Sequence, residues 1–558
     1  MKKSLALLSC LMASLVVTGC NNVNVSDIIN SALGGSESIS ESTPVDPTDV
    51  ASESEKPSVE VPSDESEPET PSTSVEETPS ESEPETPSES EPEVPSEPSE
   101  SEPEVPSEPS EPSQPEVPQV NLEFDFEKEV EIEIYTTLSA TSNYGITFDD
   151  YLTKFSEIYP NIKVTHSRIG GYDDVRDQLK TELGTGEGPN LAYCYPDHVA
   201  LYNKARQVQT LDKFIYNTQT DEQGNLLYGM SEEQRNDFIK GYWEEGKAYG
   251  DGLMYTLPLY KSTEVMYYNV DVFEELNLEI PTHWFKDDGQ APETSLEYVL
   301  EQLKVAFPDD IPLGYDSEAN WFINMCEQYG SPYTSATGNH FLFNNEKNRE
   351  FVGRFKDWYD RGLVTTQEIY GGYTSGLFCN TTDTTSARSY ISIGSSAGAV
   401  HQAPKEGEIF EVGIAPIPQV DAINNPKVIS QGPSLCLFKK ADQQQVLASW
   451  LLLRYLTTTV NFQAEMSMNS GYVPVINSVM KNPVYREFID SGEGYADSIA
   501  ALSAKVCMDQ ESYYYTSPAF VGSSDARDQV GNLIVSVFTD NTKTIAEHFE
   551  YAIKECEN

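Results

Sequence analysis

The apolar positions that follow the first 120 residues switch repeatedly between two periods. A period of two residues is typical of strands, and a spacing of three or four residues is typical of helices. The pattern predicts strands at 130–134, 162–165 and 190–195 and helices at 147–159, with Thr147 as N-cap, and 175–183. This alternation of strand and helix predicts an α/β fold with a parallel sheet, whose ligand crevice lies at the carboxyl ends of the strands.

The length of this region predicts more than one hydrophobic core. Residues 122–558 number about 435, whereas single cores stop growing near ~250–300 residues. At least two lobes are therefore expected. Further helices are predicted at 351–359 and 442–456, and two more at the end of the chain.

The N-terminus has the pattern of an export signal with a lipid attachment site. Lys2 and Lys3 precede an apolar run from Leu5 to Val17, and Cys20 follows Gly19. The run is shorter than the ~20 residues that a membrane-spanning helix needs. The expected segments are a lipoprotein signal peptide at 1–19 and an N-terminus at 20–35 that is lipidated on Cys20 and held at the outer face of the cell membrane. An ordinary secretory signal with a chance cysteine is the alternative.

A disordered stalk is predicted at residues 36–118. This segment consists almost entirely of Ser, Glu, Pro, Thr and Val, and it contributes about −25 to the formal net charge of −56. Its prolines and like charges favour an extended chain that cannot bury a core. The globular region keeps a charge of roughly −30, so we expect no nucleic-acid binding.

The spacing of cysteine and histidine residues indicates no metal site. The cysteines after Cys20 form no C-x-x-C motif, and the six histidines are dispersed. We therefore expect neither a metal nor a cofactor.

Four segments between residues 131 and 474 stand in a characteristic order. They are Glu131–Tyr135 with Tyr159–Val164, Gly188–Tyr193, Gly252–Pro258 with Met266–Asn269 and Phe273, and Gly471–Pro474. Their order and spacing resemble the extracellular solute-binding proteins that include maltose-binding protein, over most of residues 125–558. Two positions depart from that pattern. Asn190 stands where many members have aspartate, and Ser395–Gly398 replaces a tryptophan-rich stretch, which argues against a maltose-like ligand.

The resemblance implies a two-lobed, periplasmic-binding-protein-like fold that closes like a hinge over a ligand in the cleft between the lobes. It implies a monomer that captures a sugar or oligosaccharide for the permease subunits of an ABC importer, without catalysis. The implied solute-binding domain is 121–558, with lobe 1 at about 121–258 and 416–440 and lobe 2 at about 259–415 and 441–558.

A sugar site needs aromatic faces for the ring and fixed polar groups for the hydroxyls. Carried over by segment, the candidate ligand-binding residues are Ser142, Asn143 and Tyr144 after the first strand; Tyr195, Asp197 and His198 after the third; Lys261 and Glu264 at the first crossing between lobes; Ser395, Ser396 and Gln431; and the aromatic residues Tyr472, Tyr514 and Phe520. The alternatives are a solvated loop for the first group, N-capping by Asp197, a charged hinge face at the crossing, and core packing for the aromatic residues.

Two other functions stay open at this point. An extracellular glycoside hydrolase needs only a pair of carboxylates, and the chain has many, although it shows no G-x-S-x-G, H-E-x-x-H or phosphate-binding glycine loop. A sensory or adhesion module could use the same scaffold, because fold does not determine function.

Overall fold

The computed structural model describes residues 119–379, 387–404, 410–490 and 499–557. The expected signal peptide, lipidated Cys20 and stalk lie outside the described residues. Within those ranges, no helix combines the length and the apolar character that a membrane crossing requires.

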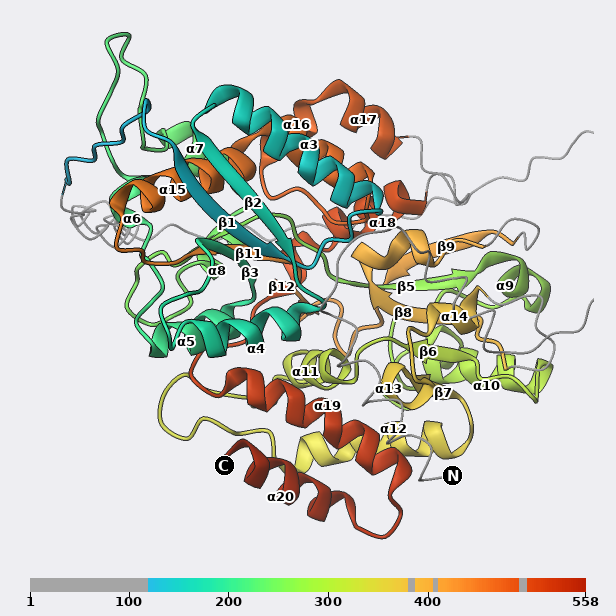
Figure 1. The fold of residues 1–558 in the computed structure, drawn as a ribbon. Helices are drawn as coiled ribbons and strands as arrows, with labels where there is room; N and C mark the ends of the chain where they lie inside the picture. Colours follow the sequence, from blue (N-terminus) through green and yellow to red (C-terminus); the bar gives the residue numbers. More distant parts are fainter. Residues whose placement is uncertain (1–118, 380–386, 405–409, 491–498, 558) are drawn as a thin grey trace, which may run out of the picture. The chain divides into compact units, whose positions relative to one another are not determined.

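The first lobe is built on a five-stranded sheet with the order β2-β1-β3-β11-β4 (Figure 1). β1, β2 and β3 run parallel, and β11 runs antiparallel to both β3 and β4. The bounds are β1 (Val130–Thr136), β2 (Ile162–Arg168), β3 (Leu191–Cys194), β4 (Thr256–Pro258) and β11 (Ser434–Leu437). The parallel β1, β2 and β3 confirm the strand–helix alternation that the apolar periods predict.

Helices cover both faces of this sheet because its strands are apolar on both sides. Ile134 packs in the core under α3 and α15, whereas the next residue, Tyr135, packs in the core under α4 and α5. The helices of this lobe are α3 (Asn143–Ile158), α4 (Tyr172–Glu182), α5 (Pro196–Lys204), α6 (Asp212–Ile215), α7 (Glu232–Asp237), α8 (Lys240–Glu245), α15 (Gln443–Thr458) and α16 (Val460–Met468). α3 begins earlier than predicted, since Ser142 and not Thr147 caps it, with Oγ accepting from the Gly145 amide at 3.1 Å.

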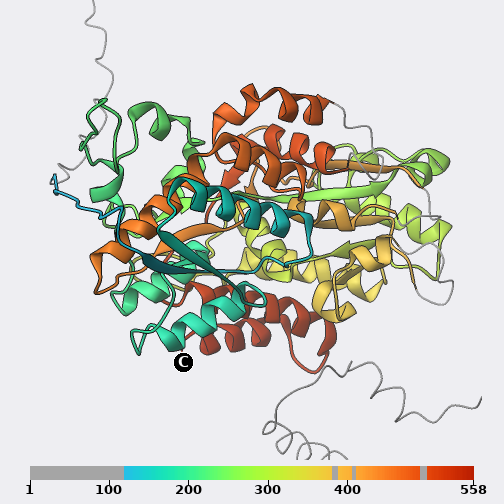
Figure 2. The ribbon, with the colours of Figure 1, turned by 45° about the horizontal axis from the view of Figure 1, so that its top comes forward.

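The second lobe is built on another five-stranded sheet, with the order β7-β6-β8-β5-β9. The strands are β5 (Glu264–Asn269), β6 (Leu313–Tyr315), β7 (Val364–Thr366), β8 (Ile391–Ser395) and β9 (Val412–Pro416). Its surrounding helices are α9 (Val270–Leu276), η1 (Pro292–Thr294), α10 (Leu296–Ala306), α11 (Glu318–Gln328), α12 (Glu346–Asp360), α13 (Gln367–Tyr370), α14 (Ser375–Phe378), η2 (Ser396–His401), α18 (Ile499–Asp509), α19 (Ser523–Thr539) and α20 (Ile545–Cys556). Its core includes three fully buried tryptophans, Trp284, Trp321 and Trp358. In Figure 2 the strands of the second sheet lie to the right of those of the first.

Three segments of the chain cross between the lobes and lie side by side. They are the segment between β4 and β5, the segment between β10 (Val428–Ile429) and β11, and the stretch from Gly471 through η3 (Asn477–Lys481), α17 (Pro483–Asp490), α18 and η4 (Glu511–Tyr513) to β12 (Tyr514–Tyr515). Backbone bridges join Lys261 to Val473 and Ser262 to Gln431, and β10 pairs with β12. These crossings form the hinge of the two-lobed fold.

Two of the boundaries expected between the lobes are wrong. The second crossing was placed at residue 416, but Ile417, Val428 and Ile429 still pack in the core of the second lobe. The second lobe was also expected to take all of 441–558, but α15 packs on β1, β11 and β4, and α16 packs on α3. The chain therefore stays in the first lobe for two more helices, because α15 together with α3 covers one face of the first sheet.

A buried ion pair lies at the crossings. Lys261 and Glu245, whose side chains are 1% and 2% exposed, form an ion pair, and Lys261 Nζ also donates to Ser434 Oγ at 3.2 Å. Glu245 Oε2 accepts from Thr516 Oγ1 at 3.2 Å, so the pair contacts all three crossings or their flanks. Gly432 lies beside it with φ +89°, and a Cβ there would meet the Lys261 and Tyr260 backbone at 2.7 Å.

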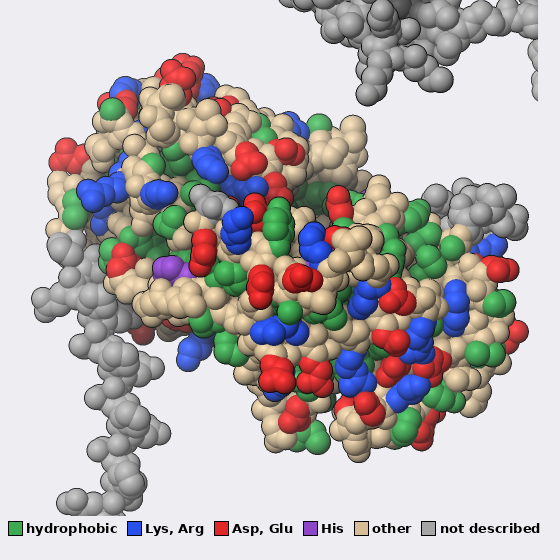
Figure 3. All heavy atoms as spheres, turned by 90° about the horizontal axis from the view of Figure 1, so that it is seen from below, with side chains coloured by type: hydrophobic (Ala, Val, Ile, Leu, Met, Phe, Trp, Pro, Cys, Tyr) green, Lys and Arg blue, Asp and Glu red, His purple; other side chains and the backbone are tan. Residues whose placement is uncertain are grey.

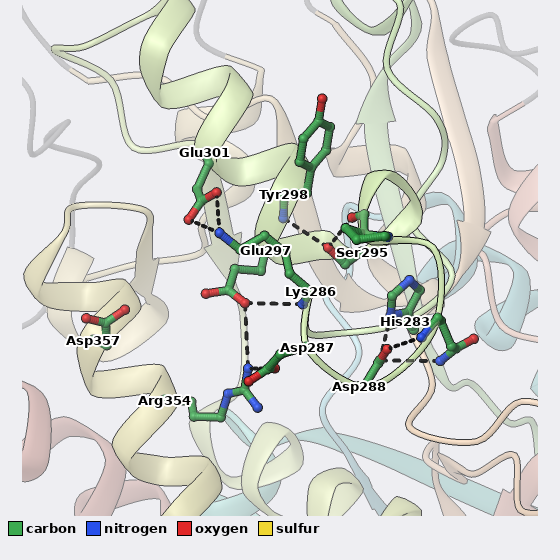
Figure 4. Close-up of polar contacts among 12 residues, drawn as sticks. His283, Lys286, Asp287, Asp288, Ser295, Glu297, Tyr298, Glu301, Arg354 and Asp357 are labelled. Atoms are coloured by element: carbon green, nitrogen blue, oxygen red, sulfur yellow. Dashed lines mark hydrogen bonds and ion pairs between the residues drawn. The ribbon is translucent and has the colours of Figure 1, made fainter.

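The loop between α9 and α10 is anchored by charged groups (Figure 4). His283 Nδ1 lies 2.6 Å from Asp288 Oδ2, Lys286 Nζ lies 2.6 Å from Glu301 Oε2, and the Lys286 amide donates to Glu297 at 3.3 Å. Acidic and basic side chains are likewise interspersed over the face seen in Figure 3. The Lys286–Glu301 pair is partly exposed, so it contributes little to stability and mainly determines the shape of the loop.

Candidate ligand-binding site

A cavity of about 840 Å³ lies between the two lobes. Its lining residues follow the carboxyl ends of β1, β2 and β3 in the first sheet and of β6 and β8 in the second. Others lie where the chain crosses the hinge. On the side of the first lobe the cavity is lined by Tyr144, Tyr172 and Tyr195 and by Tyr472 at the start of the third crossing. From the second lobe and the rest of the hinge it is lined by Ser262, Glu264, Asp316, Ser317, Asn320, Gln367, Tyr373, Ser395, Gln402, Gln431 and Arg527, among others. The cavity lies at the carboxyl ends of parallel strands, where α/β sheets bind ligands.

Tyrosine rings form the first-lobe wall of this cavity. The Tyr172 ring centroid lies 4.7 Å from that of Tyr195, and its Oη lies 3.3 Å from Tyr472 Oη. The Tyr472 ring in turn lies 4.5 Å from the buried ring of Tyr260. Burial raises the pKa of Tyr472 to about 12, so its hydroxyl stays neutral and can both donate and accept. The wall therefore offers flat apolar faces with hydroxyl groups at their edges.

Glu264 is the most buried charged group on the opposite wall, with 1% of its surface exposed. Its Oε2 accepts from Tyr315 Oη at 2.7 Å and from Asn324 Nδ2, whereas its Oε1 has no hydrogen-bond partner among the described residues. Burial raises the pKa of Glu264 to about 7, although the hydrogen bond from Tyr315 lowers it. The carboxyl group is thus held rigidly at the cavity wall, with Oε1 itself buried.

A second carboxyl group and one guanidinium complete the charged lining. Asp316 follows β6 and accepts from both the amide and Oγ1 of Thr374 at 2.7 Å, and burial raises its pKa. Arg527 of α19 donates to Asn320 Oδ1. The charged side chains of the lining are therefore two acids and one arginine, each partly occupied by protein groups.

Six of the predicted site residues line this cavity. They are Tyr144, Tyr195, Glu264, Ser395, Gln431 and Tyr472. Asp197 lies in a smaller neighbouring cavity, at the start of α5, where it accepts from Ser524 Oγ at 3.0 Å. The structure thus brings together residues that are up to 328 positions apart in the sequence. That they contact a ligand stays a prediction.

The first three predicted residues that lie away from the cavity have other contacts. Ser142 caps α3, and Asn143 is exposed at its first turn. His198 is buried against the rings of Tyr195 and Tyr202. These residues follow the strands as expected. In the folded chain, however, Ser142 caps a helix, Asn143 is exposed and His198 is packed in the core.

The other predicted residues outside the lining are buried at the hinge or in the core. Lys261 is neutralised by Glu245, and Ser396 Oγ accepts from the Thr263 amide at 3.3 Å. Tyr514 stacks on Tyr242 at 5.7 Å and donates to the Cys507 carbonyl, and Phe520 stacks on His340 at 4.6 Å. Tyr514 and Phe520 therefore pack against other protein side chains, which is the alternative that the sequence left open for them.

Several lining residues were missed. Tyr172 follows Gly170 and Gly171 behind β2, and Asp316 directly follows β6, so the position at a strand end could have indicated both. Arg527 and Tyr373 lie on or beside helices without any local motif, and only the folded chain brings them to the cavity.

Two α/β lobes joined by three crossings around a shared cavity define a two-lobed binding protein. A family model for bacterial extracellular solute-binding proteins matches residues 150–488. This match spans more than half of the chain, and the chain belongs to that family. The family and the fold class that the motifs predicted are confirmed.

Known proteins of this fold show which relatives the chain resembles. The sn-glycerol-3-phosphate-binding periplasmic protein UgpB of Yersinia pestis bv. Antiqua (strain Antiqua) is 22% identical over 366 residues, which cover 64% of this chain and 77% of that protein. UgpB from Mycobacterium tuberculosis, solved in complex with glycerophosphocholine, has a TM-score of 0.60 at 15% identity and covers 77% of this chain and 98% of that one. The ABC substrate-binding protein Lmo0181 from Listeria monocytogenes, solved with cycloalternan, has the same values. Identities this low show a shared fold.

Proposed function

We propose that this solute-binding protein captures a neutral sugar or oligosaccharide between its lobes and delivers it, unchanged, to the permease subunits of an ABC importer. The observation that supports this most directly is the cavity lining. One wall presents tyrosine rings, and the other presents carboxyl, amide and hydroxyl groups. Sugars expose C–H faces and hydroxyl groups, which pair with these two kinds of surface.

The charge of the lining favours a neutral ligand over a phosphate ester. Two acids, Glu264 and Asp316, face the cavity together with one arginine, Arg527. Phosphate is usually bound by several arginines, lysines or backbone amides, and a carboxylate nearby repels it. The names of the UgpB relatives refer to phosphate-bearing ligands, whereas the two acids in this lining favour a neutral ligand.

The size of the cavity favours a ligand with more than one ring. Its volume of about 840 Å³ falls near the upper end of the ~300–1,000 Å³ that small-molecule sites usually occupy. Tyr373, which is 68% exposed, stands at the second-lobe side of the lining, across from the first-lobe tyrosines. An oligosaccharide of two or more rings could contact both walls.

A thermal-shift and calorimetry screen of the full chain tests this function. The probes are glucose, galactose, maltose, cellobiose, xylobiose, mannobiose and maltotriose, with glycerol 3-phosphate and glycerophosphocholine as charged controls. We expect at least one neutral sugar to bind with a Kd near about 1 µM, which corresponds to about −8 kcal/mol. Binding of only the phosphate-bearing probes would refute the neutral-sugar proposal. Release of a shorter sugar during incubation would make the protein a hydrolase instead.

We infer from the sequence that Cys20 carries a lipid that holds the protein at the outer face of the membrane. The pattern of charged, apolar and small residues that precedes Cys20 supports this inference. We expect Cys20→Ala to move the protein from the membrane fraction to the soluble fraction, as measured by immunoblotting after fractionation. Retention of the variant in the membrane fraction would contradict lipidation at this residue.

A further inference from the structure

The two lobes contact each other directly at one end of the interlobe cavity. Ser524 Oγ of α19 donates to Asp197 Oδ2 of α5 at 3.0 Å. One helical turn further along α19, Asp528 Oδ2 lies 3.4 Å from Arg176 Nη1 of α4. We call these two contacts the interlobe bridge. They join α4 and α5 of the first lobe to α19 of the second, and these helices lie next to one another in Figure 1.

The interlobe bridge lies directly behind residues of the cavity lining. Tyr172 stands one helical turn before the bridging arginine of α4, Tyr195 two residues before the bridging aspartate of α5, and Arg527 directly before the bridging aspartate of α19. The small cavity beyond Tyr195 and Arg527 has a volume of about 70 Å³, room for only a few water-sized groups, so it does not extend the site by a sugar ring. A ligand that reaches these residues therefore meets protein and not solvent.

The second-lobe wall of the cavity runs from Arg527 to Tyr373 through neighbouring residues. Arg527 donates to Asn320 Oδ1 in the first turn of α11. Asp316, just before that helix, accepts from the Thr374 amide at 2.7 Å, and Tyr373 directly precedes Thr374. Arg527 and Tyr373 thus mark opposite ends of this wall.

The tyrosine wall on the other side has the same direction. The ring of Tyr195 contacts that of Tyr172 at 4.7 Å, and Tyr172 Oη lies 3.3 Å from Tyr472 Oη, so Tyr472 is the member farthest from the interlobe bridge. Burial, together with the nearby hydroxyl groups of Tyr144 and Tyr373, raises the pKa of Tyr472 to about 12. The far ends of the two walls therefore face each other.

The end of the cavity away from the interlobe bridge is open to solvent. Four residues of the described lining are exposed, and all of them lie on or next to α14 and η2. They are Tyr373, Gly376, Val400 and His401. The two segments are in contact, because Cys379 Sγ donates to the His401 carbonyl at 3.4 Å. The lining residues beside the interlobe bridge are all half-buried instead, so the cavity has one mouth and one closed end.

We propose that the cavity is a blind-ended site that binds one terminus of an oligosaccharide beside Tyr195 and Arg527 and directs the other terminus past Tyr373 into solvent. The inference rests on the proposed sugar-binding function and adds the class of ligand to it. That class is a linear chain with a free end, bound in one direction. An internal stretch of a polysaccharide has no terminus to place against the interlobe bridge.

Sugars that carry a bulky group at one end or at the other test the direction of binding. For each of the seven neutral sugars named above that binds the full chain, a p-nitrophenyl glycoside blocks the reducing end, and a 4-O-benzyl ether blocks the non-reducing ring. We expect the two Kd values, measured by calorimetry, to differ by about 30-fold or more, because protein closes one end of the cavity and the other end admits the added group. A smaller difference would overturn the proposal, whether both derivatives bind or neither does.

The role of the interlobe bridge is tested by removing both contacts. The double variant Arg176→Ala/Ser524→Ala deletes the ion pair and the hydrogen bond between the lobes. The matched control is Arg486→Ala, which breaks an ion pair to Asp490 within α17, outside both cavity linings. Because the lobes can part more easily without the interlobe bridge, we expect the ratio of the two Kd values to fall at least about threefold in the double variant and to stay unchanged in the control.

The outcomes separate this inference from the proposed function. A ratio that stays at the wild-type value in the double variant would overturn the interlobe bridge as the closed end. In both cases the binding of the unmodified sugars leaves the sugar-binding function standing. If none of the seven unmodified sugars binds the wild type, the proposed function falls, and the blind-ended site falls with it.

Discussion

Lys261→Met is expected to lower the free energy of unfolding by about 3–5 kcal/mol. The substitution leaves Glu245 as an unpaired charge that is 2% exposed, and it also removes the donor to Ser434 Oγ. The desolvation of that carboxylate is then no longer compensated. Urea unfolding of the full chain, followed by fluorescence, measures the change.

Two further variants make this prediction specific. Lys247→Met breaks a partly exposed ion pair to Glu244, and it is expected to cost less than about 1 kcal/mol. The double variant Lys261→Met/Glu245→Leu removes both buried charges and should recover most of the loss. A single variant as stable as the wild type would show that the buried pair does not hold the crossings together.

The stability of the protein should fall as pH rises from about 4.5 to about 7, and Glu264→Gln should remove this contribution. The pKa of Glu264 is about 7 in the folded protein, against an ordinary value of 4.5. Between these values the folded state binds more protons than the unfolded state, so stability decreases with rising pH. The full shift corresponds to roughly 3 kcal/mol, an order-of-magnitude figure for one buried group.

Urea unfolding at pH 4.5, 6 and 8 tests the role of Glu264, with the exposed Glu274→Gln as control. Glu264→Gln is expected to be more stable than the wild type at pH 8 and about equal to it at pH 4.5, because glutamine resembles the protonated carboxyl group. A wild type and a variant with the same dependence on pH would contradict the account of Glu264.

The fold could be predicted well because local periods and the order of elements determine it. Apolar spacing indicated β1, α3, β2, α4 and β3. The N-cap of α3 was placed five residues too late, at Thr147 instead of Ser142, because both residues carry a hydroxyl group that can cap a helix. The assignment of α15 and α16 was wrong for a different reason. Their sequence shows an apolar face but not which sheet that face covers, since this depends on contacts distant in the chain.

The site was only partly predictable from the sequence. Positions at strand ends indicated Tyr195, Glu264 and Ser395, because parallel strands bring their carboxyl ends together. Lys261 was misjudged because its partner, Glu245, lies on a helix of the first lobe, and nothing in the sequence pairs the two. Arg527, more than 300 residues after Tyr195, has no local signal for its place in the same cavity.

A crystal structure of the full chain with the best-binding neutral sugar tests the central claim most directly. We predict one intact sugar between the lobes, with a ring against Tyr172, Tyr195 or Tyr472 and its hydroxyl groups hydrogen-bonded to polar side chains of the opposite wall. A sugar bound on the surface of a single lobe, or a cleaved glycosidic bond in the cavity, would contradict the claim.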